Sequence, residues 1–126
     1  MFKRPMYGAA IAVLVTLASP MASAAGWVAI LKNSPVEDFN DEDLRLYLDA
    51  VKQVLYAPAS PQPLEWQNTA SGASGTLLVV GNPQLKNQGE CRQVRITVHS
   101  RKRQGGPSLF TACRQADAGW MLIGTN

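Results

Sequence analysis

Two residues of this chain can react with each other: Cys91 and Cys113, the only cysteines among its 126 residues. Each is followed by an arginine, and each lies in a run of residues typical of a β-strand. In an oxidising compartment such a pair favours a disulfide, which for a loop of this size stabilises the fold by roughly 3 kcal/mol. We therefore predict a hairpin with a Cys91–Cys113 disulfide, which leaves no thiol as a nucleophile.

The other reactive side chains form no recognisable catalytic or metal-binding set. His99 is the only histidine, and Ser100 would point to the opposite face of a strand. The acidic run at residues 41–43 fans around a helix, so it suits a helix start better than a metal cluster. The chain has no phosphate-binding loop and no dinucleotide-binding glycine motif. We expect no catalytic residues, metal or cofactor, and we interpret His99 as a surface or edge residue.

One candidate contact site remains, the basic tip, which consists of Arg101, Lys102 and Arg103 between the two cysteine-containing runs. It could bind an anionic partner, such as lipopolysaccharide phosphates, peptidoglycan carboxylates or an acidic protein. Alternatively, it is a solvated hairpin tip that discourages pairing at sheet edges. Nucleic acid is not expected as a partner, because the chain offers no row of aromatic residues on which bases could stack.

The N-terminal residues predict export. Two basic residues precede an apolar run over residues 6–18, and Ala-Ser-Ala at 22–24 fits a signal-peptidase site. The run is shorter than the roughly 20 residues that span a bilayer. Residue 25 is alanine rather than the cysteine that a bacterial lipoprotein needs. We expect a signal peptide over residues 1–24 and one domain over 25–126, located in the periplasm or at the outer membrane without a lipid anchor or transmembrane segment.

Charge is unevenly divided in the predicted mature chain. Residues 25–65 carry three basic and seven acidic residues, a net charge of −4, whereas residues 66–126 carry seven basic and two acidic residues, a net charge of +5. Opposite charges of this kind help a helix dock on a sheet, or help separate copies associate.

One amphipathic helix is expected over residues 39–56, with Asn40 or Asp41 as its N-cap. Its apolar face is formed by residues that recur at intervals of four, three and four: Leu44, Leu48, Val51 and Leu55. Four further residues broaden this face, so the helix is expected to be covered on more than one side: Leu46, Tyr47, Ala50 and Val54. Residues 27–31 are interpreted as a strand or an extended arm. Three prolines in residues 57–63 exclude a helix there and favour an extended connector.

Five short β-type runs follow the connector, separated by turn-forming residues. They are 64–68, 76–80, 94–98, 108–114 and 120–123, with a turn expected over 70–75. Trp66 and Trp120 are expected in the core, with Arg92 and Arg114 stacked on one of them or the other. This order predicts an α+β domain in which one helix packs on a small antiparallel meander.

Part of this pattern resembles the C-terminal domain of the rickettsial-type 17 kDa surface antigen family of bacterial envelope proteins. The resemblance covers roughly the stretch from the helix to the C-terminus. It is carried by these residues: Trp66, Asn68, Ser71, Gly72, Gly75, Cys91, Arg92, Ala112–Gln115, Asp117 and Gly119–Trp120. The chain lacks the lipid-bearing cysteine and the glycine-zipper segment that many members carry.

The resemblance implies an exported envelope protein to which no catalytic activity is attributed. We therefore expect a non-enzymatic protein that acts through contacts with an envelope protein, with other copies of itself, or with the envelope. The alternative is a periplasmic binding or inhibitor module whose basic tip engages an anionic ligand or envelope polymer.

Overall fold

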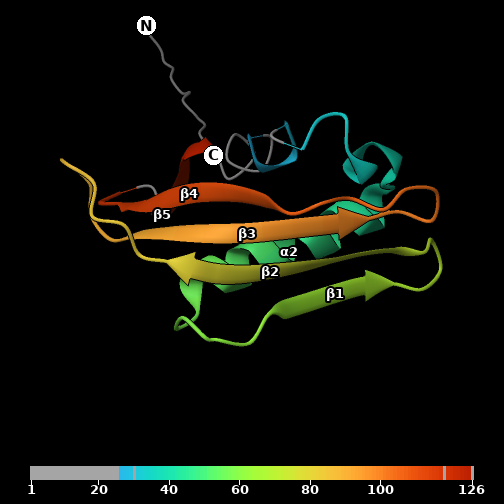
Figure 1. Cartoon of the computed structure of the whole chain (residues 1–126), viewed down its shortest axis with the longest axis horizontal. Helices are drawn as coiled ribbons and strands as arrows, with labels where there is room; N and C mark the ends of the chain where they lie inside the picture. Colours follow the sequence, from blue (N-terminus) through green and yellow to red (C-terminus); the bar gives the residue numbers. More distant parts are fainter. Residues whose placement is uncertain (1–25, 30, 118, 126) are drawn as a thin grey trace, which may run out of the picture.

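A computed structural model describes residues 26–29, 31–117 and 119–125 of the chain. Its five antiparallel strands follow one another in sequence order across a single sheet (Figure 1). The strands are β1 Leu64–Asn68, β2 Ala73–Gly81, β3 Cys91–His99, β4 Ser108–Gln115 and β5 Gly119–Thr125. The predicted α+β fold, with its meander and its disulfide, is therefore confirmed. The predicted signal peptide over residues 1–24 lies outside the described residues.

The long helix, α2 Asp41–Tyr56, begins after Asn40, which settles the choice between the two expected N-caps. The Asn40 side chain accepts from the Asp43 backbone N–H at 2.8 Å, and the Asp43 carboxylate accepts from the Asn40 N–H at 3.0 Å. This reciprocal capping box satisfies two donors that have no partner within the helix. The sequence around residue 40 therefore determines where α2 starts.

The face of α2 that packs on the sheet is shifted toward the residues expected to broaden it, because Tyr47 and Ala50 are buried beside Val51 and Leu55. Its buried residues are Asp43, Tyr47, Ala50, Val51 and Leu55, whereas Leu44 and Leu48 lie at the margins of the contact and are only half-buried. The Tyr47 hydroxyl donates to the carbonyl of Trp27 at 2.9 Å, and burial raises the pKa of Tyr47 well above its ordinary value. The rotation of α2 is thus set by buried polar anchors as well as by leucine spacing.

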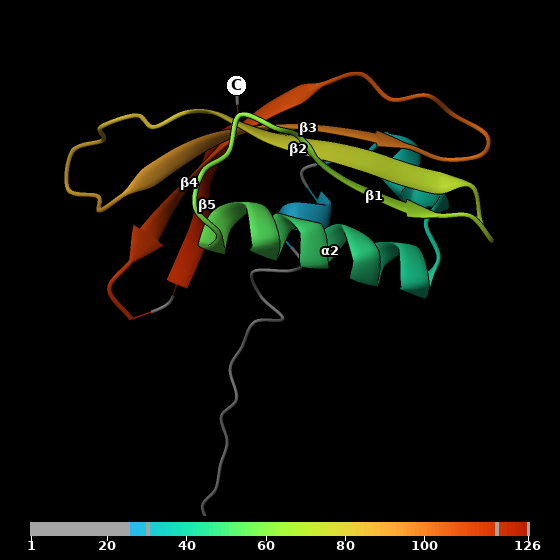
Figure 2. The same ribbon diagram turned by 90° about the horizontal axis from the view of Figure 1, so that it is seen from below.

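Helix α2 covers one face of the curved sheet, and Figure 2 shows it lying along that face. The core lies between these two layers and includes Leu77, Val94, Ile96 and Phe110, all less than 3 % exposed. Because strand residues alternate between faces, their neighbours point away from α2. None of the helices in the described part of the chain is long and apolar enough to cross a membrane.

Residues 26–29 are helical, so the expectation of a strand or extended arm at 27–31 is wrong. A helical turn places residues four positions apart on one side, which allows both Trp27 and Leu31 to be buried. The Trp27 ring meets Phe110 of β4 edge to face, with 6.3 Å between ring centres. A 3-10 helix, η1 Pro35–Asp38, follows and lies against β3.

The expected turn over residues 70–75 is shorter in the structure, because β2 already begins at Ala73. Gly75 pairs with Trp66 across the strands, and a Cβ atom at Gly75 would lie 2.5 Å from Trp66 Nε1. The glycine therefore serves strand packing, where its missing side chain leaves room for the tryptophan.

Candidate functional site

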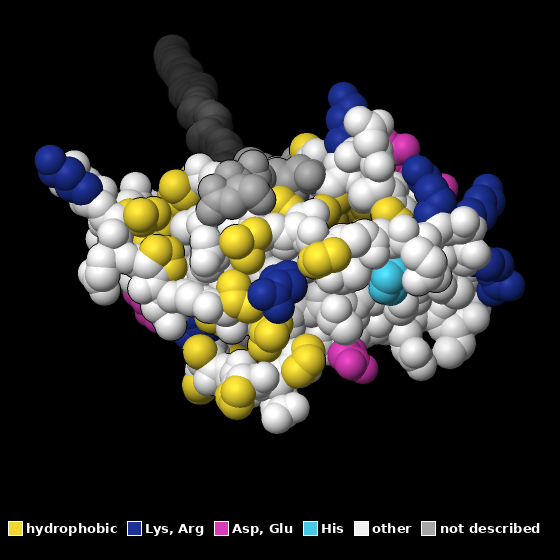
Figure 3. Space-filling view, viewed as in Figure 1, with side chains coloured by type: hydrophobic (Ala, Val, Ile, Leu, Met, Phe, Trp, Pro, Cys, Tyr) yellow, Lys and Arg dark blue, Asp and Glu magenta, His cyan; other side chains and the backbone are white. Residues whose placement is uncertain are grey.

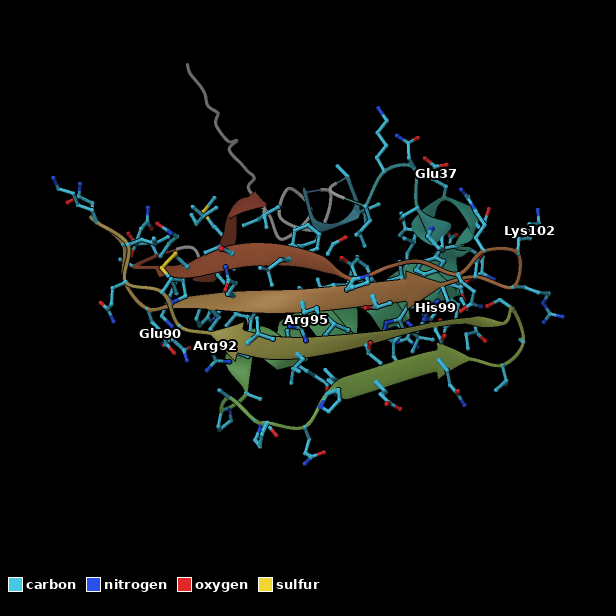
Figure 4. All side chains as sticks on the ribbon, viewed as in Figure 1. Glu37, Glu90, Arg92, Arg95, His99 and Lys102 are labelled. Atoms are coloured by element: carbon cyan, nitrogen blue, oxygen red, sulfur yellow. A yellow bond between two sulfur atoms is a disulfide. The ribbon has the colours of Figure 1, made fainter. Side chains whose placement is uncertain are left out.

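The two cysteines face each other on β3 and β4 and form the predicted disulfide, with 4.0 Å between their Cα atoms. Both residues are buried. The bond, the yellow link in Figure 4, joins the strands at the end of the hairpin opposite the basic tip. Since both cysteines are oxidised, they supply no thiol chemistry.

Arg92 follows Cys91 and therefore points to the opposite, helix-covered face. Its Nη1 donates to the carbonyls of Val54 and Ala57, both at 2.8 Å, at the C-terminal end of α2. Its guanidinium lies over the Trp120 ring, with 5.3 Å from the guanidinium carbon to the ring centre. The predicted stacking on a core tryptophan is confirmed, and it fastens the helix to the sheet.

Arg114 also lies over Trp120, at 5.4 Å, but from a more exposed position. Glu90 is close to both arginines, at 3.7 Å from Arg114 and 3.6 Å from Arg92. This cluster of opposite charges surrounds Trp120 and the C-terminal end of α2. Its contacts connect the helix to the sheet and indicate a structural role.

The basic tip does not present three free cations. Arg101 turns back and donates to the carbonyls of Ser71 and Ala70, at 3.2 and 3.3 Å. Lys102 is exposed and makes no hydrogen bond or ion pair with a described residue. In Figure 4 it extends from the loop away from the body of the protein.

Arg103 binds η1 through two 2.9 Å hydrogen bonds to the Asp38 carboxylate and a 3.7 Å ion pair with Glu37. Asp38 also accepts from the Ser100 hydroxyl at 2.7 Å. The hydrogen bonds from Arg103 and Ser100 lower the pKa of Asp38 from 3.8 to about 2. Arg103 therefore closes the hairpin connection onto η1, and only Lys102 of the tip points freely into solvent.

Asp43 is the most deeply buried acidic residue that the structure describes, at 1 % exposed. Burial alone would raise its pKa, but hydrogen bonds from the Ser71 hydroxyl, the Asn40 N–H and the Asn68 amide outweigh burial and lower it. The Asn68 and Ser71 contacts measure 2.8 and 2.7 Å. Asp43 thus ties the start of α2 to the β1–β2 turn as a carboxylate.

His99 is the last residue of β3, the central strand of the sheet, and is half-buried on the face away from α2. Its Nδ1 accepts from the Gly105 N–H at 3.2 Å, so that nitrogen is used to hold the loop. A solvent-open hollow beside it is lined by Glu65, Gln67 and Ser74 among others. A second hollow lies between residues 31–35 and the β3–β4 connection. Ser74 and His99 face each other across the strands in the first hollow, but no hydrogen bond joins their side chains in the described part of the chain.

The sheet face turned away from α2, here called the open face, was not recognised as a candidate site from the sequence. By strand alternation and register its side chains include the buried Cys91–Cys113 disulfide and Glu65, Gln67, Ser74, Thr76, Leu78, Gln93, Arg95, Thr97, His99, Leu109, Thr111 and Met121. Strand alternation in β3 could have indicated that Arg95 points outward. The apolar run Leu77–Val80 concealed the outward Leu78, because a run without polar residues does not show which face is buried.

Apolar side chains gather on part of the open face. Met121 and the bulge residue Ile123 on β5 are both 43 % exposed, and the bulge residue Val80 on β2 is 37 % exposed. Figure 3 shows yellow side chains around a central dark blue one, which Figure 4, drawn in the same view, labels Arg95. Solvated faces of antiparallel sheets usually carry polar residues, so this concentration is unusual.

The residues that carry the family resemblance mostly hold the fold together. Asn68 and Ser71 bind Asp43, Gly75 admits the Trp66 ring, and Arg92 joins the helix end to Trp120. Gly72 adopts a left-handed conformation, with φ of 82°. These contacts give the motif residues a role in folding.

Comparison with known proteins gives no match to a family model, to a characterised protein or to a solved structure. Within the described residues, no group of three or more histidine, cysteine, aspartate or glutamate side chains is placed to hold a metal ion.

Proposed function

We propose that this chain is an exported bacterial envelope protein that acts by binding another macromolecule rather than by catalysis. The observation that carries the proposal is the open face, where apolar side chains remain exposed on a sheet whose other face is already packed. Exposed apolar patches on small proteins commonly mark interaction sites. The proposed contact is therefore made by the sheet, which is a rigid surface held by the disulfide and by α2.

Three features support the envelope as the location. The N-terminal sequence has the order of a signal peptide. The Cys91–Cys113 bond is of a kind that persists in oxidising compartments such as the periplasm. The resemblance to the surface antigen domain favours the same location, either in the periplasm or at the outer membrane.

The alternative function is binding of an anionic ligand or envelope polymer at the basic tip. Lys102 favours it, since its charge is unpaired within the described residues. Arg101 and Arg103 favour it less, because their guanidinium groups already bind Ser71 and Asp38. Binding of purified lipopolysaccharide or peptidoglycan that disappears in an Arg101→Ala, Lys102→Ala, Arg103→Ala variant would support this alternative.

Fractionation of bacteria that express the full chain tests the location. The expected product is a periplasmic or outer-membrane-associated protein that begins at Ala25, with both cysteines protected from alkylation until a reductant is added. A cytoplasmic protein with an intact N-terminus and two alkylatable thiols would contradict the proposal. Photo-crosslinkers placed on several surfaces of the exported protein then test whether it contacts another macromolecule at all.

A further inference from the structure

Arg95 lies at the centre of the open face between two leucines. Its register partners are Leu78 on β2 and Leu109 on β4, so an aliphatic side chain flanks it on both neighbouring strands. Both leucines are half-buried and Arg95 is exposed. Cross-strand neighbours on one face lie close enough to interact directly. The guanidinium therefore rises between two leucines, with Gln93 and Thr97 on either side of it along β3.

The other arginines that the structure describes are all engaged. Arg45 pairs with acids on its own helix, Arg92 and Arg101 bind backbone carbonyls, and Arg103 binds an aspartate. Arg114 lies near Glu90 and stacks on Trp120. Arg95 alone makes no hydrogen bond or ion pair with another described residue. Among the described arginines, Arg95 is therefore the one whose charge has no described partner.

We infer that the open face around Arg95 docks a protein partner that presents an aspartate or glutamate within an apolar segment. This inference rests on the proposed contact function and specifies its surface and its partner. A guanidinium can bind a carboxylate through two parallel hydrogen bonds. Leu78 and Leu109 would exclude water around that pair, and the arrangement matches the arginine anchors and apolar centres of protein interfaces.

Charge distinguishes this partner from the other possible occupants. Two copies packed face to face about a twofold axis at this patch would bring Arg95 against Arg95, which opposes association. A bilayer surface favours aromatic side chains and several basic residues. The described open face has one arginine, no lysine and no aromatic residue, and it also carries Glu65. A carboxylate inside an apolar protein segment fits both features of the patch.

Site-specific photo-crosslinking in the cells that naturally produce the full chain tests the inference. The probe, p-benzoylphenylalanine, replaces Gln93 or Thr97, which flank Arg95 on the same face of β3. Matched probes replace Lys52 on the exposed side of α2 and Lys102 at the basic tip. The expected result is a protein adduct from positions 93 and 97 and none from position 52. Mass spectrometry should place the adduct beside an aspartate or glutamate flanked by apolar residues.

Charge reversal provides the second readout. Arg95→Glu should reduce the adduct about tenfold or more, as expected at the centre of an interface, and replacing the partner's carboxylate with lysine should restore it. Circular dichroism should show that Arg95→Glu is folded, since Arg95 has no described partner within the fold. Leu109→Ser, at the register partner of Arg95 on β4, tests the apolar component and should weaken the adduct without changing charge.

The outcomes separate this inference from the broader proposal. An adduct from position 102 alone would overturn the inference while leaving a contact function at the tip. A lipid adduct, an adduct to a second copy, or a protein adduct unaffected by Arg95→Glu would also overturn it. If no probed surface yields any adduct, both the inference and the proposed contact function fail.

Discussion

The Arg92 guanidinium lies over the Trp120 ring at 5.3 Å while its Nη1 binds the last carbonyls of α2. Carbonyls at a helix C-terminus lack partners within the helix and form the negative end of its dipole. A buried cation at this position therefore satisfies the helix end and packs on the sheet at the same time. Arg92 directly follows Cys91, so the disulfide and the contacts between the helix and the sheet stabilise the same part of the fold.

Replacing Arg92 with Met should lower the free energy of unfolding by about 2–3 kcal/mol, because the carbonyls of Val54 and Ala57 at the helix end lose a charged donor. Arg114→Met is the matched control. Arg114 lies over the same tryptophan but is 54 % exposed, so its loss should cost less than about 1 kcal/mol. Urea unfolding of both variants measures the difference, and equal losses would show that the helix-end contacts contribute little.

Removing the disulfide should destabilise the domain by about 3 kcal/mol, since the unfolded chain gains the freedom that the bond restricts. For a domain of this size the melting temperature should fall by roughly 12–20 °C. The change is Cys91→Ser with Cys113→Ser, followed by thermal melts with and without dithiothreitol. Reductant should lower the wild-type melting temperature toward that of the variant and leave the variant unchanged. A wild-type protein insensitive to both treatments would contradict the assigned role of the bond.

Stability should depend on Asp38 between about pH 4 and pH 2. Hydrogen bonds from Arg103 and Ser100 lower the pKa of Asp38 to about 2. A lowered pKa means that the native state favours the carboxylate, so its stabilisation is complete above the ordinary pKa of 3.8 and is lost as the pH falls toward 2.

The measurement for Asp38 is the melting temperature of wild type and Asp38→Asn from pH 2 to pH 6. Wild type should be more stable than the variant above pH 4, and the gap should close near pH 2. Asp41→Asn, at an exposed position in the first turn of α2, controls for general effects of removing an acid. A gap that stays constant across this range would exclude the proposed linkage.

Gly75→Ala should destabilise the sheet by about 1–3 kcal/mol through overpacking. A Cβ atom there would lie 2.5 Å from Trp66 Nε1 and 3.0 Å from the Thr97 carbonyl oxygen. Gly106→Ala is the control, because a Cβ atom at Gly106 meets nothing within 4 Å. Trp66 fluorescence should also change in the Gly75 variant. If both variants unfold at the same denaturant concentration, the close fit between Gly75 and Trp66 is not a determinant of stability.

Local features of the chain were predictable because neighbouring residues produce them. Capping chemistry at Asn40 starts α2, three prolines keep residues 57–63 out of a helix, and alternation in β3 identifies its inward residues. The segment at 27–31 was not predictable. Its apolar run fits a strand and a helical turn equally well, and contacts with Phe110 and Tyr47 decide between them.

Part of the candidate site was likewise visible in the sequence and part of it was not. The basic tip was visible as a run of three charges, but the partners of Arg101 and Arg103 lie about 30 and 65 residues away in sequence. The open face combines residues from different strands, so no single stretch displays it. Arg95 is inconspicuous in sequence and becomes a candidate only when Leu78 and Leu109 are placed beside it.

The sequence by itself determined the disulfide partners, the order of helix and strands, and the α+β class, because local propensity and a single pair of cysteines suffice for these. The tertiary structure decided which arginines form hydrogen bonds or ion pairs within the fold and which face of the sheet is not covered by α2. Those properties depend on register and on the docking of α2, which bring together residues that are distant along the chain. The same packing that neutralises Arg92 and Arg103 leaves Arg95 without a described partner.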